Sequence, residues 1–350
     1  MLNRKLKQNH NQGRSLIEEI IEKLNLNLTG AVIITEMASN HFIYTPFIAA
    51  LAGARKVIAV TKDSQFGSAD EIINQGIKLA LEWNLDQVIS VKSLNLDYIS
   101  EADIITNLGF VRPISRSFID QMKTGAVIAH MSEAWEYRPG DIDLKACRKN
   151  DIAVMGTNEK FNGLKIFESC GPLLGKIMFE ADLEIKGKRY LILSRDAFGI
   201  TLSNYLNING ADAILLNNAS DANRISIEGF DGIIIADYHS HHFLIGKSGW
   251  ITPEQLANAS PNTIVLQFVG SADVKYVQEA GLVCIPNYSL ESHRMWRTLS
   301  YLGPKPVIEL HTAGLKVGEL MWNLAKRGLN SHQIIRKLGI PAGLCQTIDY

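Results

Sequence analysis

The sequence has few cysteines and no long apolar run. Its four cysteines, Cys147, Cys170, Cys284 and Cys345, lie far apart and form no C-x-x-C pair, which suits reduced thiols better than a disulfide framework. No uncharged apolar run reaches the roughly 18 residues that could span a membrane. Residues 1–14 are polar and lack the apolar core of a signal peptide. We therefore expect a cytoplasmic protein without membrane contact.

An excess of charge of one sign is also lacking. The chain has 35 Lys and Arg against 36 Asp and Glu, so no basic field favours a nucleic-acid partner. Hydrophobic residues make up 46% of the 350 positions, which is ample for two domain cores. A small-molecule ligand is the expected partner. A homodimer is a further candidate, because large parallel-sheet enzymes often pair through flanking helices.

Short β-branched strands separated by helical stretches fill the first half of the chain. They lie at residues 31–35, 56–60, 87–90, 102–106, 125–129 and 152–155. Apolar strands that alternate with helices are typical of a parallel sheet covered on both faces. The pattern predicts an N-terminal arm and helix over residues 1–28 and a first Rossmann-like domain over residues 29–167.

A second set of strands begins in the stretch 186–217, which has the order strand, tight turn, helix, strand that opens a Rossmann domain. Further apolar runs at 232–236, 263–266 and 282–285 continue the pattern. We predict a second Rossmann-like, nucleotide-type domain over residues 168–300. The helices expected over residues 301–350 are candidates to pack back on the first domain. The predicted fold class is α/β, with two doubly wound parallel-sheet domains and an interdomain cleft.

The turn at residues 194–199 is where a dinucleotide fingerprint, G-x-G-x-x-G, would lie. Ser194 and Asp196 stand at the first two glycine positions, and Gly199 stands at the third. Asn217 takes the place of the acid that would bind a ribose 2′-hydroxyl. A carboxylate at the second position would repel a pyrophosphate. These four residues are the candidate cofactor contacts for NAD or NADP.

The densest group of reactive side chains is Asp237-Tyr-His239-Ser-His241-His242, directly after a predicted strand. In open α/β sheets ligands bind beyond the carboxyl ends of the strands. His239 or His241 could exchange a proton with a substrate hydroxyl while Asp237 orients the ring. The same three residues could instead hold zinc, or the loop could be a hydrated turn without chemistry.

The first predicted domain offers further candidates at its strand ends. Glu36 and His41 follow the first strand, and Glu133 with Glu136 follows the strand that ends near His130. These side chains could bind a polar substrate in the cleft. Trp135 could stack on a planar ring. Ordinary strand-end turns and a capping or packed histidine are the alternatives.

Several of these stretches resemble S-adenosylhomocysteine hydrolase. Asn40-His41 and the turn ending at Asp70 resemble turns of that family's substrate domain, and the resemblance places Glu133 at or beside an active-site glutamate. It keeps His41 and Asp70 at substrate-domain positions. Together with the strand-end residues above, this gives Glu36, Asn40, Asp70 and Trp135 as the candidate substrate contacts. Stretches 102–106, 112–115 and 122–128 are similar to the D-2-hydroxyacid dehydrogenases of the same two-domain group. Ser271 stands where the hydrolase has a histidine next to the nicotinamide, so that family's own reaction is not expected.

Three hypotheses follow for function. The first is an NAD(P)-dependent oxidoreductase for a small hydroxy-acid or nucleoside-like substrate, with His239, His241, Asp237, Glu133 and His41 at the catalytic centre. The second is a non-redox transferase or hydrolase of the same fold that binds a nucleoside or S-adenosyl ligand, with zinc as a candidate aid. The third is a catalytically silent binding relative.

Overall fold

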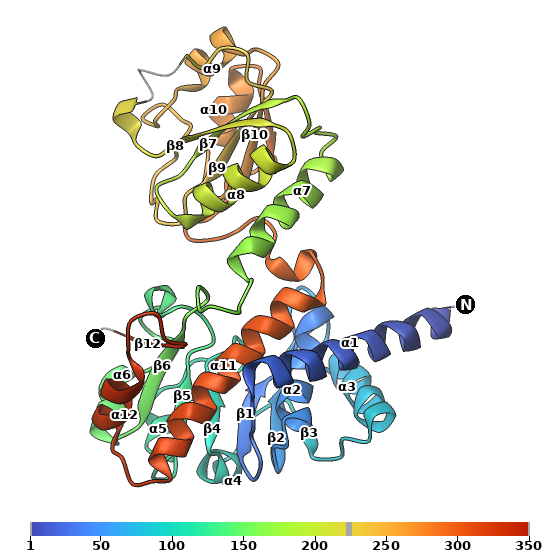
Figure 1. Ribbon diagram of the computed structural model, residues 1–350, viewed down its shortest axis with the longest axis vertical. Coiled ribbons are helices and arrows are strands. Elements are labelled where there is room, and N and C mark those ends of the chain that lie inside the picture. The colour runs from blue at the N-terminus through green and yellow to red at the C-terminus, as the bar shows by residue number, and fades with distance from the viewer. Residues whose placement is uncertain (1, 222–225, 349–350) are drawn as a thin grey trace. The chain divides into compact units, whose positions relative to one another are not determined.

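The computed structural model describes residues 2–221 and 226–348, with side chains from residue 12 onward. The chain forms two compact units, of which unit 1 comprises Met1–Ile166 and Gly303–Tyr350 and unit 2 comprises Phe167–Leu302. Each unit contains one sheet of mostly buried strands with helices packed against it (Figure 1). The predicted pair of Rossmann-like α/β domains is confirmed.

The sheet of unit 1 has the strand order β12-β6-β5-β4-β1-β2-β3. Its strands are β1 (Val32–Glu36), β2 (Lys56–Val60), β3 (Val88–Val91), β4 (Ile104–Thr106), β5 (Val127–Ala129), β6 (Ala153–Thr157) and β12 (Cys345–Thr347). Neighbouring strands are parallel, except that β12 is antiparallel to β6. Without β12, the order 3-2-1-4-5-6 is the one found in dinucleotide-binding sheets, although the eroded fingerprint lies in unit 2.

Helices cover both faces of this sheet because residues along each strand point alternately to the two sides. The helical segments of unit 1 are α1 (Leu2–Leu24), η1 (Asn40–Tyr44), α2 (Thr45–Leu51), α3 (Ala69–Trp83), α4 (Leu96–Glu101), α5 (Arg116–Ile119), η2 (Ala134–Glu136), α6 (Leu144–Lys149), α11 (Pro304–Ala325) and α12 (Ser331–Leu338). On one face Ile34, Ile105 and Ile128 pack against Ile119 of α5 and Cys147 of α6.

The long helix α11 lies against the other face of the sheet of unit 1 (Figure 1). Two glycines one turn apart permit the close approach. A Cβ on Gly314 would lie 2.5 Å from the sulfur of Met131, and one on Gly318 would lie 2.6 Å from Ile104 Cγ2. The indole N–H of Trp322 donates to Asp103 Oδ1 at 3.1 Å. The C-terminal segment is therefore an integral layer of unit 1.

Unit 2 contains a wholly parallel sheet of order β11-β10-β9-β7-β8. Its strands are β7 (Arg189–Leu193), β8 (Asp212–Leu216), β9 (Gly232–Ala236), β10 (Ile264–Val269) and β11 (Val283–Ile285). Because β8 and β9 pair with opposite edges of β7, the strand order reverses between β7 and β9. This switch point is where open α/β sheets bind ligands.

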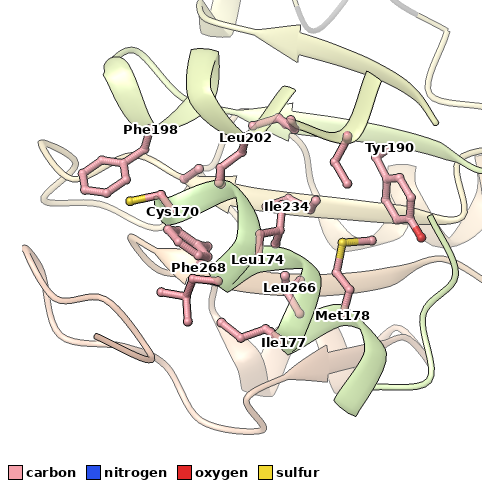
Figure 2. Packing of buried hydrophobic residues seen from close by; sticks show 14 of the residues in the cluster. Cys170, Leu174, Ile177, Met178, Tyr190, Phe198, Leu202, Ile234, Leu266 and Phe268 are labelled. Atoms are coloured by element: carbon pink, nitrogen blue, oxygen red, sulfur yellow. The ribbon is translucent and has the colours of Figure 1, made fainter. Parts of the chain in front are cut away.

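Two hydrophobic layers enclose the sheet of unit 2. Its helical segments are η3 (Phe167–Ser169), α7 (Cys170–Glu180), α8 (Ala197–Ile208), η4 (Ala219–Asp221), α9 (Pro253–Ala259), α10 (Val274–Glu279) and η5 (Leu299–Tyr301). Figure 2 shows Leu174 and Ile177 of α7 packed against Ile234 and Leu266 of the sheet. Leu256 of α9 belongs to the layer on the opposite face. Within the described part of the chain, no helix is long and apolar enough to cross a membrane.

Candidate functional site

The turn between β7 and α8 uses its own side chains to bind the amides that begin the helix. Asp196 caps α8, and its Oδ1 accepts the Phe198 N–H at 3.0 Å. The hydroxyl of Ser194 accepts the Gly199 N–H at 3.1 Å and donates to Asp196 Oδ1 at 3.1 Å. Gly199 has no room for a side chain, because a Cβ there would lie 2.4 Å from the Cβ of Ser194. The third fingerprint glycine therefore serves close helix–strand packing.

This arrangement does not fit a dinucleotide held in the usual way. In a Rossmann site the first helical amides and the positive end of the helix dipole bind the pyrophosphate. Here the Asp196 carboxylate and the Ser194 hydroxyl accept two of those N–H groups. A phosphate would have to displace a hydrogen-bonded anion from the same place. Asn217 follows β8 and is exposed, so it supplies no carboxylate for a ribose.

The two loops at the switch point of unit 2 are joined by reciprocal hydrogen bonds. Asp196 Oδ2 accepts the Tyr238 N–H at 2.7 Å, and Asp237 Oδ2 accepts the Arg195 N–H at 3.0 Å. The Arg195 guanidinium also donates to both Asp237 oxygens, at 2.7 Å from Nε and 3.1 Å from Nη2. Asp237 is fully buried, so this bidentate pairing satisfies a charge that water cannot reach.

The histidine loop, residues 237–242, follows β9. Its rings contact His293, a partner that the sequence did not suggest. The rings of His241 and His293 are 4.6 Å apart in an edge-on arrangement, and Tyr238 lies 5.7 Å from His239 and 5.1 Å from His293. His293 comes from the segment after β11, so only folding brings it here. Among the side chains of residues 12–221 and 226–348, no three of His, Cys, Asp or Glu are placed to hold a metal ion. The structure thus pairs Asp237 with Arg195 and does not group it with His239 and His241 as zinc ligands.

The candidates near the first strand of unit 1 lie in different settings. Glu36 is buried, its Oε2 accepts the Phe110 N–H at 2.7 Å, and burial raises its pKa. His41 lies in η1 after the exposed Asn40, and its ring stacks on Tyr44 at 6.4 Å. Asp70 forms an exposed ion pair with Lys92 at 2.8 Å. Their substrate contacts, and a cleft shared with the histidine loop, remain predictions.

Three glutamates of unit 1 form a carboxylate cluster, defined here as Glu133, Glu136 and Glu159. Burial raises the pKa of Glu136 to about 7, the Glu133 N–H hydrogen bond opposes this, and the Glu133 carboxylate adds to it. Burial, followed by the charges of Glu136 and Glu133, raises the pKa of Glu159 well above its usual value. Since burial and neighbouring carboxylates favour the protonated form of a carboxyl group, Glu136, with a pKa of about 7, is suited to acid–base work.

A short segment of chain positions this cluster and one wall of a hollow. Ala134 of η2 packs so tightly on β6 that a Cβ at Gly156 would lie 2.8 Å from the Ala134 nitrogen, and Gln346 Oε1 accepts the Ala134 N–H at 2.8 Å. Beside η2 is a hollow of about 640 Å³, which lies within the size range of small-molecule sites. Its lining residues are Ala134, Trp135, Tyr137, Asn158, Gly339–Gly343 and Cys345–Thr347.

Two further side chains of unit 1 hold the cluster in place. The Trp135 indole N–H donates to Glu133 Oε2, while the ring is 42% exposed. His130 is buried, its Nδ1 lies 3.0 Å from the Ser132 carbonyl, and burial lowers its pKa. His130 is therefore a neutral structural partner of the turn. Glu159 was missed from the sequence, because nothing in its local pattern indicates that it meets Glu133.

Comparisons with known proteins find structures of similar fold but assign the chain to no sequence family. No protein-family model and no curated protein sequence matches the chain. Among solved structures, one component of dipicolinate synthase from Bacillus halodurans is similar, with 14% identity, 86% of this chain and 98% of that chain covered, and a TM-score of 0.50. The corresponding component from Bacillus subtilis has 15% identity, coverage of 87% and 98%, and a TM-score of 0.49.

A third structure is the NAD+-bound 3-phosphoglycerate dehydrogenase from Entamoeba histolytica, with 14% identity, coverage of 86% and 97%, and a TM-score of 0.39. At such identities the likeness concerns the fold alone. The chain is thus a two-domain Rossmann-like protein. In particular, its fold is similar to that of the dipicolinate synthase component from Bacillus halodurans.

The pKa of Glu136 predicts how stability depends on pH. Its folded value of about 7 lies above the ordinary 4.5, so the unfolded chain loses this proton first as pH rises. Glu136 therefore lowers stability progressively between these two values. We expect Glu136→Gln to match the wild type near about pH 4 and to exceed its free energy of unfolding by about 1–3 kcal/mol near about pH 8. Denaturant unfolding across this range measures the difference.

The matched control is Glu254→Gln, which changes an exposed glutamate of α9 and should leave the pH dependence as in the wild type. A difference between Glu136→Gln and the wild type that stays constant with pH would contradict the assignment.

Proposed function

We propose that this chain is an enzyme that binds a small polar substrate beside the carboxylate cluster of unit 1 and transfers a proton through Glu136. The observation that carries the proposal is the crowding of Glu133, Glu136 and Glu159 at a turn whose Ala134 and Trp135 line a substrate-sized hollow. Such crowding costs stability, because each charged form is disfavoured by burial and by its neighbours. Perturbed acids of this kind concentrate at functional sites.

The chemistry of the cluster follows from the position of Glu136. An acid whose pKa is about 7 exists in both protonation states near neutral pH, so it can accept a proton in one step and return it in another. Glu133 is the more deeply buried partner, and its backbone N–H donates to Glu136 Oε1 at 3.2 Å. The hollow can accept a hydroxy-acid or nucleoside-like substrate in size.

Redox chemistry with NAD(P) is the second candidate function. It is favoured by the strand–turn–helix unit of β7 and α8 and by Gly199, which packs as the third fingerprint glycine does. It is opposed by Asp196, whose carboxylate already caps the helix. Under the first proposal unit 2 does not hold a dinucleotide at this turn, and the acid–base site of unit 1 works without one.

A thermal-shift titration with NAD and NADP separates the two candidates. A nucleotide present at about 50 times its Kd would add on the order of 2 kcal/mol to the stability of the native state. We expect no change in the Tm of the wild type, because the Asp196 carboxylate already accepts the Phe198 N–H at the start of α8. Asp196→Gly, which frees them, provides the comparison. A dose-dependent rise in the Tm of the wild type with either nucleotide would favour the oxidoreductase.

The proposed function itself is tested by substrate screening followed by turnover. Hydroxy acids and nucleosides that raise the Tm of the wild type are incubated with it, and product is followed by mass spectrometry. We expect Glu136→Gln to bind the same compounds but to convert them about 10²–10⁴-fold more slowly, the usual contribution of a general acid or base. Glu254→Gln should match the wild type. Conversion by Glu136→Gln at the wild-type rate would exclude Glu136 as the proton carrier.

A further inference from the structure

Glu133, the most buried acid of the carboxylate cluster, has one oxygen without a hydrogen-bond donor among the described residues. Glu133 is only 1% exposed, and its Oε2 accepts the Trp135 indole N–H. Its Oε1 is buried, and within the described residues no donor reaches it. An acceptor left without a donor in a dry setting costs about 1–3 kcal/mol, and more when it is charged. The free protein therefore holds an acceptor suited to an incoming N–H or O–H.

Negative charge dominates around the two other glutamates of the cluster, Glu136 and Glu159. The carboxylates of Glu136 and Glu133 raise the pKa of Glu159 more than the ammonium of Lys160 lowers it. The Glu133 carboxylate likewise affects Glu136 more than the guanidinium of Arg138 does. The nearby cations therefore do not neutralise the cluster. A group that carries positive charge would be attracted to it.

Asp237 of unit 2 is a buried acid with a cation as its direct partner, and it is a useful comparison for the carboxylate cluster of unit 1. Asp237 is equally buried, yet both its oxygens accept hydrogen bonds from Arg195. A buried carboxylate is stabilised by such a cation or else takes up a proton. Burial is the largest cause of the raised pKa values of Glu136 and Glu159, and the neighbouring cations offset it least, so a cationic ligand would supply the missing partner.

The ring of Trp135 adds a second kind of contact for a cation. The hydrogen bond to Glu133 fixes the indole N–H, while the ring remains 42% exposed and lines the hollow. The face of an indole is the best aromatic partner for an ammonium group. Glu133 itself is not among the residues that line the hollow, and Trp135 connects the two, because its ring lines the hollow and its N–H contacts Glu133.

We propose that the carboxylate cluster binds a protonated amine of the small-molecule substrate, with Glu133 as its main acceptor and the ring of Trp135 beside it. This inference rests on the proposed function and names the substrate class of the same site. An ammonium group suits the site better than a metal ion, because the described residues contain no three acids or imidazoles placed to hold one. Three N–H donors can serve carboxylates that are spaced more widely than metal ligands.

The test uses two probes that differ in one group, 3-amino-1-propanol and 1,3-propanediol. Each is titrated into the full chain at constant ionic strength and slightly alkaline pH, and the Tm is recorded. We expect the amine to raise the Tm and the diol to leave it unchanged. Glu133→Gln keeps the shape of the side chain but removes its charge, so it should weaken amine binding at least about tenfold. Glu254→Gln should bind the amine as the wild type does.

A second measurement does not depend on the stability of the variants. An ammonium in the cluster should displace protons, so calorimetry near neutral pH in two buffers of different ionisation enthalpy should show proton release on amine binding. Equal effects of the amine and the diol, or amine binding by Glu133→Gln with unchanged affinity, would overturn the inference.

The two proposals can fail separately. If the amine and the diol bind alike while Glu136→Gln still abolishes turnover, the proton carrier stands and the amine class is wrong. If amine binding depends on Glu133 while Glu136→Gln turns over normally, the binding site stands and the catalytic role is wrong.

Discussion

A buried carboxylate must be stabilised by a cation, by amide N–H groups or by a proton. Both units of the protein show this requirement. In unit 2, Asp196 and Asp237 find amides and a guanidinium within the two loops at the switch point. In unit 1, burial and, to a smaller extent, neighbouring carboxylates raise the pKa values of Glu136 and Glu159. Asp196 and Asp237 thus hold two loops together through hydrogen bonds, whereas Glu136, with a pKa of about 7, can exchange protons near neutral pH.

The proposed activity depends on this contrast between the loops of two Rossmann-like units. The fold provides loops at the carboxyl ends of parallel strands, and the residues on those loops decide the chemistry. In unit 2 the Asp196 carboxylate takes the place where a pyrophosphate would sit, so the loops stabilise each other. In unit 1 the close packing of η2 on Gly156 and its hydrogen bond to Gln346 position the turn that carries Glu133 and Glu136 and whose Ala134 and Trp135 line the hollow. The proposed reaction follows from these loop residues and not from the fold.

The sequence predicted the fold better than the site, for physical reasons that particular residues show. Apolar runs such as residues 188–193 and 232–236 carry a strong local signal, and they form β7 and β9. Strand β12 has three residues and no apolar run, so the partner of Ala134 could not be foreseen. The hydrogen bonds of Arg195 to Asp237, the ring contact of His241 with His293 and the electrostatic effect of Glu133 on Glu159 join residues distant in the chain. No local pattern encodes them.

The most direct test of the account is the titration of Glu136 itself. NMR of the full chain labelled with 13C at the glutamate side-chain carboxyls, with Glu136→Gln to assign the signal, gives the pKa of that group without a substrate. The account predicts one glutamate that titrates near 7 and disappears in the variant. Titration of Glu136 near 4.5, the ordinary glutamate value, would contradict it.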